Sequence, residues 1–151
     1  MNIRLATAGD ANMLIEFNLA MALETEGKRL DPAVVDSAVR SVFTDPEKGF
    51  YVVAEDEGQI LGGLMVTREW SDWRNGWWWW VQSVYIRPEG RGRRVYSHLY
   101  DFVKAKAKEA GACGIRLYVE TENIHAQRVY EKVGMERSHY LMYEEMSEPP
   151  A

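Results

Sequence analysis

The chain has 151 residues, the length of one domain, and 46% of them are hydrophobic, which is enough for a single core. A net charge of −5 without a basic stripe argues against nucleic-acid binding, and a single cysteine excludes an internal disulfide. No apolar run reaches the ~18 residues of a membrane span and no signal peptide is evident, so we expect a cytoplasmic protein.

The first half of the sequence predicts a short strand, two helices and then three strands. Asp31-Pro32 starts the second helix, because aspartate caps a helix and proline fits its first turn. Gly62-Gly63, in the middle of a strand pattern, predicts a bulge or a close approach of two backbones. In chain order we expect a strand at 3–6, a helix after Thr7–Asp10 that ends at Gly27, a helix from Pro32, and strands at 50–54, 60–69 and 77–87.

The second half alternates strands with helices. A loop at 90–94 leads into a helix that ends before Gly111, and Gly134 closes a second, shorter helix. The remaining elements are strands at 115–119 and 138–145. Hairpin strands followed by a strand–helix–strand unit make a mixed α/β fold with an antiparallel and a parallel part. We expect one domain over residues 1–146 and a flexible tail over 147–151.

The stretch from Val84 to Leu99 carries the clearest chemical signal. A strand ends at Pro88, a loop of glycine and arginine follows, and a helix starts at once. Free N–H groups at the start of a helix bind anions, and glycine lets a ligand approach the backbone. The Walker phosphate-binding pattern is absent, and the dinucleotide pattern that starts at Gly90 fails at Val95, where it needs glycine. The stretch therefore suits a pyrophosphate held by another kind of loop.

Two motifs in the sequence resemble the GNAT superfamily of N-acetyltransferases. That family carries Q/R-x-x-G-x-G/A at a strand–loop–helix junction, and the residues from Arg91 to Tyr96 lie in that register. Arg91 matches the first position, but Arg94 stands where the family has glycine and Tyr96 where it has glycine or alanine. The second motif, N-x-x-A-x-x-x-Y-x-x-x-G-F/M, matches Asn123–Met135 at every marked position. The resemblance covers roughly residues 3–145.

The resemblance implies acetyl transfer from acetyl-CoA to a primary amine. It also implies a mixed sheet of about six to seven strands with about four helices, in which the cofactor enters a gap between two splayed parallel strands. Here those strands are 77–87 and 115–119. Backbone amides hold the pyrophosphate and a strand pairs with the pantetheine arm, while an arginine at position 94 suits the 3′-phosphate. The implied cofactor-binding residues are Ser83, Val84, Tyr85, Ile86, Arg91, Gly92, Arg93, Arg94, Val95, Tyr96, Ser97 and Asn123.

Tyr130 and Glu69 are the catalytic candidates. The departing thiolate needs a proton or a hydrogen bond, and a phenol with a pKa near ~10 can supply it. The resemblance assigns this role to Tyr130, whereas its helical spacing from Ala126 and Val129 also suits a plain core tyrosine. An alkylamine must lose a proton before it attacks, and Glu69 is the leading candidate base. A solvated surface charge is the alternative for each carboxylate. The other candidate bases are Glu24, Asp72 and Glu120.

An unusual run of tryptophans lies between Glu69 and Trp80. Aromatic faces beside acidic groups favour an organic cation, and in the family this hairpin borders the acceptor pocket. We therefore predict an acceptor pocket formed by Glu24, Trp70, Asp72 and Trp73. Strand alternation puts Trp78 and Trp80 on one face and Trp77 and Trp79 on the opposite face. One pair then belongs to the core or to a dimer interface, and a purely structural role for the segment is the alternative.

Two enzyme classes and one binding module remain open. The acceptor is the amine of a small molecule, or it is the amine of a protein lysine or N-terminus. The third alternative is a non-catalytic module that binds acetyl-CoA, which the replaced glycine positions keep open. His98, His125 and His139 show no metal-ligand spacing, so we expect no metal site. We also expect no nucleic-acid or membrane partner, and a homodimer is an expectation from the family alone.

Overall fold

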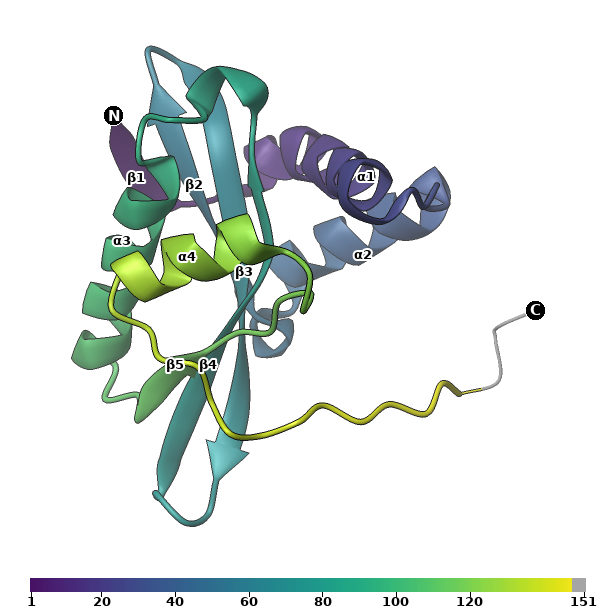
Figure 1. The fold of residues 1–151 in the computed structure, drawn as a ribbon. Coiled ribbons are helices and arrows are strands. Elements are labelled where there is room, and N and C mark those ends of the chain that lie inside the picture. The colour runs from purple at the N-terminus through teal and green to yellow at the C-terminus, as the bar shows by residue number, and fades with distance from the viewer. Residues whose placement is uncertain (148–151) are drawn as a thin grey trace. The chain divides into compact units, whose positions relative to one another are not determined.

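The computed structural model describes residues 1–147, and Figure 1 shows the chain as a ribbon. The chain divides into two compact units, which we call the N-terminal unit (residues 1–118) and the C-terminal unit (from residue 119). Of the flexible tail expected at 147–151, Ser147 is described and the other residues lie outside the described range. Within residues 1–147, none of the helices combines the length and the apolar character needed to cross a membrane.

The N-terminal unit is a mixed sheet with three helices. Its strands are β1 (Asn2–Leu5), β2 (Phe50–Asp56), β3 (Gln59–Ser71), β4 (Gly76–Ile86) and β5 (Gly114–Arg116). Its helices are α1 (Ala11–Glu26), α2 (Pro32–Thr44) and α3 (Val95–Glu109). The strands lie in the order β1-β2-β3-β4-β5, antiparallel through β4, and β5 pairs with β4 in parallel. The expected mixed α/β class is therefore confirmed.

The connection between α1 and α2 follows the predicted capping chemistry. The Asp31 carboxylate accepts a hydrogen bond from the N–H of Ala33 at 2.9 Å, which caps α2 next to Pro32. Gly27 ends α1 with a φ of 63°, a left-handed conformation that costs glycine little. These two local signals set where one helix ends and the next begins.

Helices cover both faces of this sheet (Figure 1). α1 and α2 lie on one side of the strands and α3 lies on the other. One buried cluster joins α1 and α2 to the sheet and contains Leu14, Phe17, Val39, Val53 and Tyr85. The buried residues of α3 include Val95, Leu99 and Val103. Burying a side chain of this size contributes about 1.5–3 kcal/mol, so these two layers hold the unit together.

A β-bulge interrupts the pairing of β3 with β4 next to the predicted cofactor strand. Between the paired residues Gln82 and Tyr85, β4 holds one residue more than β3. Ser83 lies in this bulge with a φ of 54°. The extra residue shifts the alternation of side chains by one position, so Tyr85 packs in the cluster of α1 and does not share a face with Trp79 and Val81.

The predicted gap beside β4 begins where its pairing with β5 stops. In the described ladder, β5 pairs with Trp78–Trp80, whereas β4 runs on to Ile86. The edge of β4 beyond Trp80 therefore lies outside the pairing with β5. A splayed pair of parallel strands requires this arrangement.

Three expectations about the strands are wrong. The sheet has five strands where about six to seven were expected, and β5 ends at Arg116 instead of 119. The described residues include no strand at 138–145, and the helix of the C-terminal unit is α4 (Ile124–Lys132). The strand prediction rests on the apolar run Tyr140–Tyr143, but a strand forms only where a neighbouring backbone takes its hydrogen bonds. The described strand pairings do not include this run.

The close approach predicted at Gly62 is confirmed and can be tested with alanine. A Cβ at Gly62 would lie 2.8 Å from the carbonyl oxygen of Tyr85 and 2.7 Å from the side chain of Ile86. We expect Gly62→Ala to lower the free energy of unfolding by ~1–3 kcal/mol in urea denaturation, the usual cost of overpacking. Gly9→Ala is the control, since a Cβ there meets an ordinary contact at 3.6 Å. Equal stability of the two variants would contradict the close approach.

Candidate active site

The loop between β4 and α3 leaves the start of a helix accessible to an anion. α3 begins at Val95, and in the described chain the preceding Arg94 makes no side-chain hydrogen bond that caps the helix. The first N–H groups of a helix have no partner within the helix, and the helix dipole adds positive potential there. Gly92 has a φ of 80°, and beyond its chain neighbours no described atom lies within 4 Å of the place where a Cβ would stand. A phosphate group can therefore approach this backbone.

Arg94 adopts the conformation for which the family uses glycine. Its φ of 58° lies in the left-handed region, where a side chain costs about 1–2 kcal/mol. Arg91 pairs with Glu24 at 3.1 Å, and Arg93 pairs with Asp56, whose carboxyl pKa it holds below the usual range. Within residues 1–147 the Arg94 guanidinium forms no ion pair. Of the three loop arginines, Arg94 is thus the one that no described carboxylate neutralises.

Tyr96 replaces a small residue of the family motif without filling the loop. Its side chain is 8% exposed, and its ring lies 6.1 Å from the ring of Tyr100, one turn further along α3. The bulk of Tyr96 therefore belongs to the core. The resemblance assigns to the cofactor only the backbone of this residue, and a buried ring leaves that backbone accessible.

The residues predicted to line the pantetheine arm occupy the bulged end of β4. The segment from Ser83 to Ile86 lies beyond the last described pairing with β5, so that edge of β4 is outside the ladder. An extended ligand can add to such an edge as another strand would. The side chain of Tyr85 turns toward α1 instead, and its ring lies 5.2 Å from the ring of Phe17.

Glu24, near the end of α1, connects three elements of the N-terminal unit. One carboxylate oxygen accepts a hydrogen bond from the Tyr85 hydroxyl at 3.3 Å, and the other accepts one from Arg91 at 3.1 Å. The Arg91 side chain also donates to the carbonyl of Ile86 and lies 5.8 Å from the centroid of the Tyr85 ring. Burial, with Glu24 as a smaller cause, raises the pKa of Tyr85, so its phenol stays protonated. Sequence reasoning missed this link, because uninterrupted alternation puts Tyr85 on the other face.

The aromatic and acidic side chains of the 69–80 segment hold a cation of the protein itself. The Arg116 guanidinium of β5 lies 3.7 Å from the centroid of a Trp78 ring and pairs with Glu69 at 3.1 Å. The same oxygen of Glu69 accepts a hydrogen bond from the indole N–H of Trp80 at 2.9 Å. Trp78 and Trp80 thus share a face, as alternation predicts, while Trp79 is buried. The sequence predicts that this segment binds a cation. At Trp78 and Glu69, the bound cation is the Arg116 side chain.

The four residues predicted for the acceptor pocket do not gather in one place. The hairpin tip between β3 and β4 carries three of them, which are Trp70, Asp72 and Trp73. Glu24 lies beside Tyr85, and from Trp77 at the tip to Tyr85 the strand rises over roughly 25 Å. Trp73 is 91% exposed, and Trp70 packs against Trp77 with the rings 5.0 Å apart. Of the four, Glu24 is the residue that lies at the cofactor end of β4.

Asn123 and Tyr130 belong to the C-terminal unit. The Asn123 side chain caps α4 by accepting a hydrogen bond from the N–H of Ala126 at 3.1 Å. This contact explains the asparagine of the second motif as a helix cap. Burial raises the pKa of Tyr130, so its phenol stays protonated at neutral pH. Tyr130 therefore has the protonation state that a proton donor needs.

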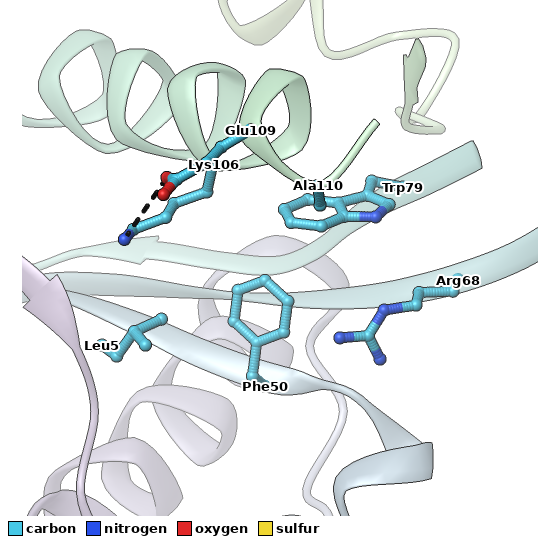
Figure 2. Close-up of a pocket in the computed structure, with 7 residues that line it drawn as sticks. All are labelled: Leu5, Phe50, Arg68, Trp79, Lys106, Glu109 and Ala110. Atoms are coloured by element: carbon cyan, nitrogen blue, oxygen red, sulfur yellow. Dashed lines mark ion pairs between the residues drawn. The ribbon is translucent and has the colours of Figure 1, made fainter. Parts of the chain in front are cut away.

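A surface pocket of about 470 Å³ lies at the C-terminal end of α3, opposite the end that follows the loop from β4 (Figure 2). Its lining residues are Leu5, Phe50, Arg68, Trp79, Lys106, Glu109 and Ala110. Because the last turn of α3 lines the pocket and the first turn borders the loop, the two places are roughly 15–20 Å apart along the helix. The pocket is therefore separate from the predicted cofactor site. Among residues 1–147, the pocket included, no group of three or more His, Cys, Asp or Glu side chains is placed to hold a metal ion.

Comparison with known proteins identifies the family. The model of the acetyltransferase (GNAT) family matches residues 15–135, which is most of the chain. The chain belongs to this family. The match confirms the resemblance that the two sequence motifs indicated. No curated protein matches the sequence.

Three solved structures illustrate the likeness of the GNAT chain to known folds. A possible acetyltransferase from Clostridium difficile 630 is 39% identical, with 97% of each chain covered and a TM-score of 0.90. A predicted acetyltransferase with acetyl-CoA from Clostridium acetobutylicum is 18% identical, with 95% of each chain covered and a TM-score of 0.77. A ribosomal-protein-alanine N-acetyltransferase from Brucella melitensis biovar Abortus 2308 is 16% identical over 97% of this chain and 100% of that chain, with a TM-score of 0.77. The last two share the fold, and identities this low carry over no acceptor.

Replacing Arg94 separates backbone strain from phosphate binding. Glycine removes the cost of the left-handed φ, so Arg94→Gly should raise stability by ~0.5–1.5 kcal/mol in urea denaturation. Loss of the guanidinium should make the affinities for CoA and dephospho-CoA more equal, which calorimetry measures. Arg94→Asn tolerates this φ and lacks the charge, so it should show the same loss of preference. An unchanged preference for CoA in both variants would mean that Arg94 points to solvent.

Proposed function

We propose that this GNAT acetyltransferase moves an acetyl group from acetyl-CoA to the primary amine of a small cationic molecule. The observation that carries the proposal is the start of α3, without a side-chain cap in the described chain, behind the arginine loop and next to the unpaired edge of β4. Membership of the family supports acetyl transfer. Acetyl-CoA, when bound, supplies the acetyl group as a thioester. The acceptor class is inferred from the charges beside β4.

The loop and the strand edge fit the parts of this co-substrate. The N–H groups of Gly92 and of the first turn from Val95 to Ser97 would bind the pyrophosphate, and the Arg94 guanidinium would bind the 3′-phosphate. The edge of β4 from Ser83 to Ile86 would bind the pantetheine arm through its backbone. Because the pyrophosphate and pantetheine contacts come from the backbone, they tolerate side chains where the family has small residues.

Two carboxylates on one face of the sheet support a cationic acceptor. Glu24 and Glu69 lie on the face toward which Tyr85 turns, and each is about half exposed. Glu24 binds the Arg91 guanidinium and Glu69 binds that of Arg116. Because each carboxylate is about half exposed, a cationic ligand can reach it beside its arginine partner. Glu69 lies opposite Trp78, seven residues before Tyr85 in β4, so roughly 20 Å of strand separates the two carboxylates. A polyamine, with several positive charges along an extended chain, fits these contacts best.

Two residues move protons in the proposed reaction. Glu69 takes a proton from the acceptor ammonium, which makes the amine nucleophilic. Because Oε1 of Glu69 is held by Arg116 and Trp80, Oε2 is the atom that receives this proton. Tyr130 gives a proton to the leaving thiolate, and burial keeps its phenol in the protonated form. The proton that the nitrogen still carries after its attack restores the Tyr130 phenol through solvent as the amide forms. The acetyl group passes directly to the amine.

A panel of amines tests the acceptor class. Release of the CoA thiol is measured with polyamines, amino acids and amine drugs, and with peptides that carry a free lysine or N-terminus. We expect kcat/KM for small cationic amines to exceed that for the peptides by about tenfold or more. Acetyl-CoA should also raise the melting temperature, because it binds the native state alone. A preference for peptides would contradict the small-molecule acceptor, and binding without any turnover would favour the non-catalytic module.

Removing one hydroxyl tests the proton donor. Tyr130→Phe keeps the ring, so kcat should fall by about tenfold or more, since a general acid contributes ~10²–10⁴-fold. Affinity for acetyl-CoA should stay within about twofold, because the lost contact acts in the transition state. The protonated phenol disappears as pH rises through its raised pKa, so the wild type should lose rate at alkaline pH and the variant should not. Tyr143→Phe, at an exposed tyrosine, is the control. A wild-type kcat in Tyr130→Phe would remove this residue from the mechanism.

A further inference from the structure

Glu24 contacts the loop between β4 and α3 and, at the same time, the strand β4 itself. Its Oε1 accepts from the Tyr85 hydroxyl and its Oε2 from the Arg91 guanidinium. Tyr85 is 8% exposed and packs on Phe17, so its hydroxyl has a fixed position. The Glu24 and Arg91 side chains are 44% and 51% exposed, so ligands can reach their ion pair. One carboxylate oxygen therefore has a permanent partner and the other has an exchangeable one.

The partner that can exchange belongs to the loop on which the pyrophosphate would bind. Arg91 is the first residue of the family motif, and its guanidinium is held by a half-exposed carboxylate. An ion pair this exposed changes an equilibrium constant by about 1.4- to 5-fold. A pyrophosphate carries more negative charge than a carboxylate and suits the planar guanidinium. Binding of the cofactor thus competes with Glu24 for Arg91.

We propose that Glu24 is the carboxylate that binds a second ammonium of the acceptor, distinct from the one that Glu69 deprotonates, and that Arg91 covers Glu24 until the cofactor binds. When the pyrophosphate draws Arg91 away, Oε2 of Glu24 loses its cation and the acceptor ammonium takes that place. The Tyr85 hydroxyl holds Oε1 throughout, so the carboxylate does not rotate away. This inference rests on the proposed function and adds to it a coupling between the two substrates.

The exchange has a signature that a purely structural role lacks. Because one carboxylate oxygen binds either Arg91 or the ammonium, removing it should strengthen cofactor binding and weaken acceptor binding. A Glu24 that only holds the fold together would weaken both on removal, or neither. The opposite signs of the two effects therefore identify the exchange.

Calorimetry with CoA and steady-state kinetics with a cationic amine measure the two effects. Without amine, Glu24→Gln and Glu24→Ala should each bind CoA about two- to fivefold more tightly than the wild type. The KM for the amine should rise by about tenfold, since a hydrogen bond to a charged group is lost. Tyr85→Phe should raise this KM and leave the affinity for CoA within about twofold. Glu26→Gln is the matched control on α1, because Glu26 pairs with Lys28 outside the loop, and it should change neither quantity.

Different results overturn the exchange and the proposed function. Affinity for CoA that is unchanged or weaker in both Glu24 variants overturns the exchange, and so does an unchanged KM for the amine. A wild-type protein that binds no CoA, or that acetylates no amine, overturns the proposed function itself. Melting curves for every variant, recorded with and without CoA, show whether a loss of binding comes from unfolding.

Discussion

The β-bulge at Ser83 sets the side-chain register of β4, the strand to which we assign the proposed cofactor and acceptor contacts. The extra residue reverses the alternation, so Tyr85 turns toward α1 and Glu24, while the backbone edge from Ser83 to Ile86 lies outside the pairing with β5. A positive φ at a serine costs of order 1–3 kcal/mol, and the buried cluster around Phe17 and Tyr85 offsets this cost. One irregularity of the backbone thus supports both halves of the proposed site.

Pairs of arginine and carboxylate side chains organise the charge around this strand. The pairs are Arg91 with Glu24, Arg93 with Asp56, and Arg116 with Glu69. In a chain with a net charge of −5, two of these pairs place carboxylates directly on loop arginines. Two loop arginines are neutralised locally, and the start of α3 together with Arg94 supplies the remaining positive potential. The pairs with Arg91 and Arg116 also hold the Glu24 and Glu69 side chains in defined positions.

Family membership settles the class of reaction, while the acceptor depends on a few side chains. One fold supports many acceptors, because substrate choice depends on groups placed on the scaffold. In this chain the informative groups are Glu24 and Tyr85, which lie at the cofactor end of β4. The tryptophans of the hairpin tip, by contrast, pack on one another or are exposed, as at Trp70 and Trp73. Their large apolar area therefore stabilises or extends the hairpin at a distance from Glu24.

Local signals made much of the fold predictable. The cap at Asp31, the left-handed Gly27 and the glycine–arginine loop before Val95 each depend on a few neighbouring residues, so the helices and the phosphate loop follow from the sequence. The prediction of a strand at 138–145 was wrong, because β propensity measures what a segment favours and does not show whether a partner strand is available. The same limit applies to the predicted acceptor pocket, because three of its residues are close in sequence at the hairpin tip while Glu24 lies beside Tyr85.

By itself the sequence determined the mixed α/β class, the helix boundaries, the position of the glycine–arginine loop before α3 and the two family motifs. Tertiary structure alone decided that Tyr85 meets Glu24, 61 positions away in the chain, and that Arg116 stacks on Trp78. Capping, turns and helical spacing act over one or two turns of chain, so they can be read residue by residue. A contact between distant residues depends on strand register, and a single bulge at Ser83 changes that register for every side chain that follows in β4.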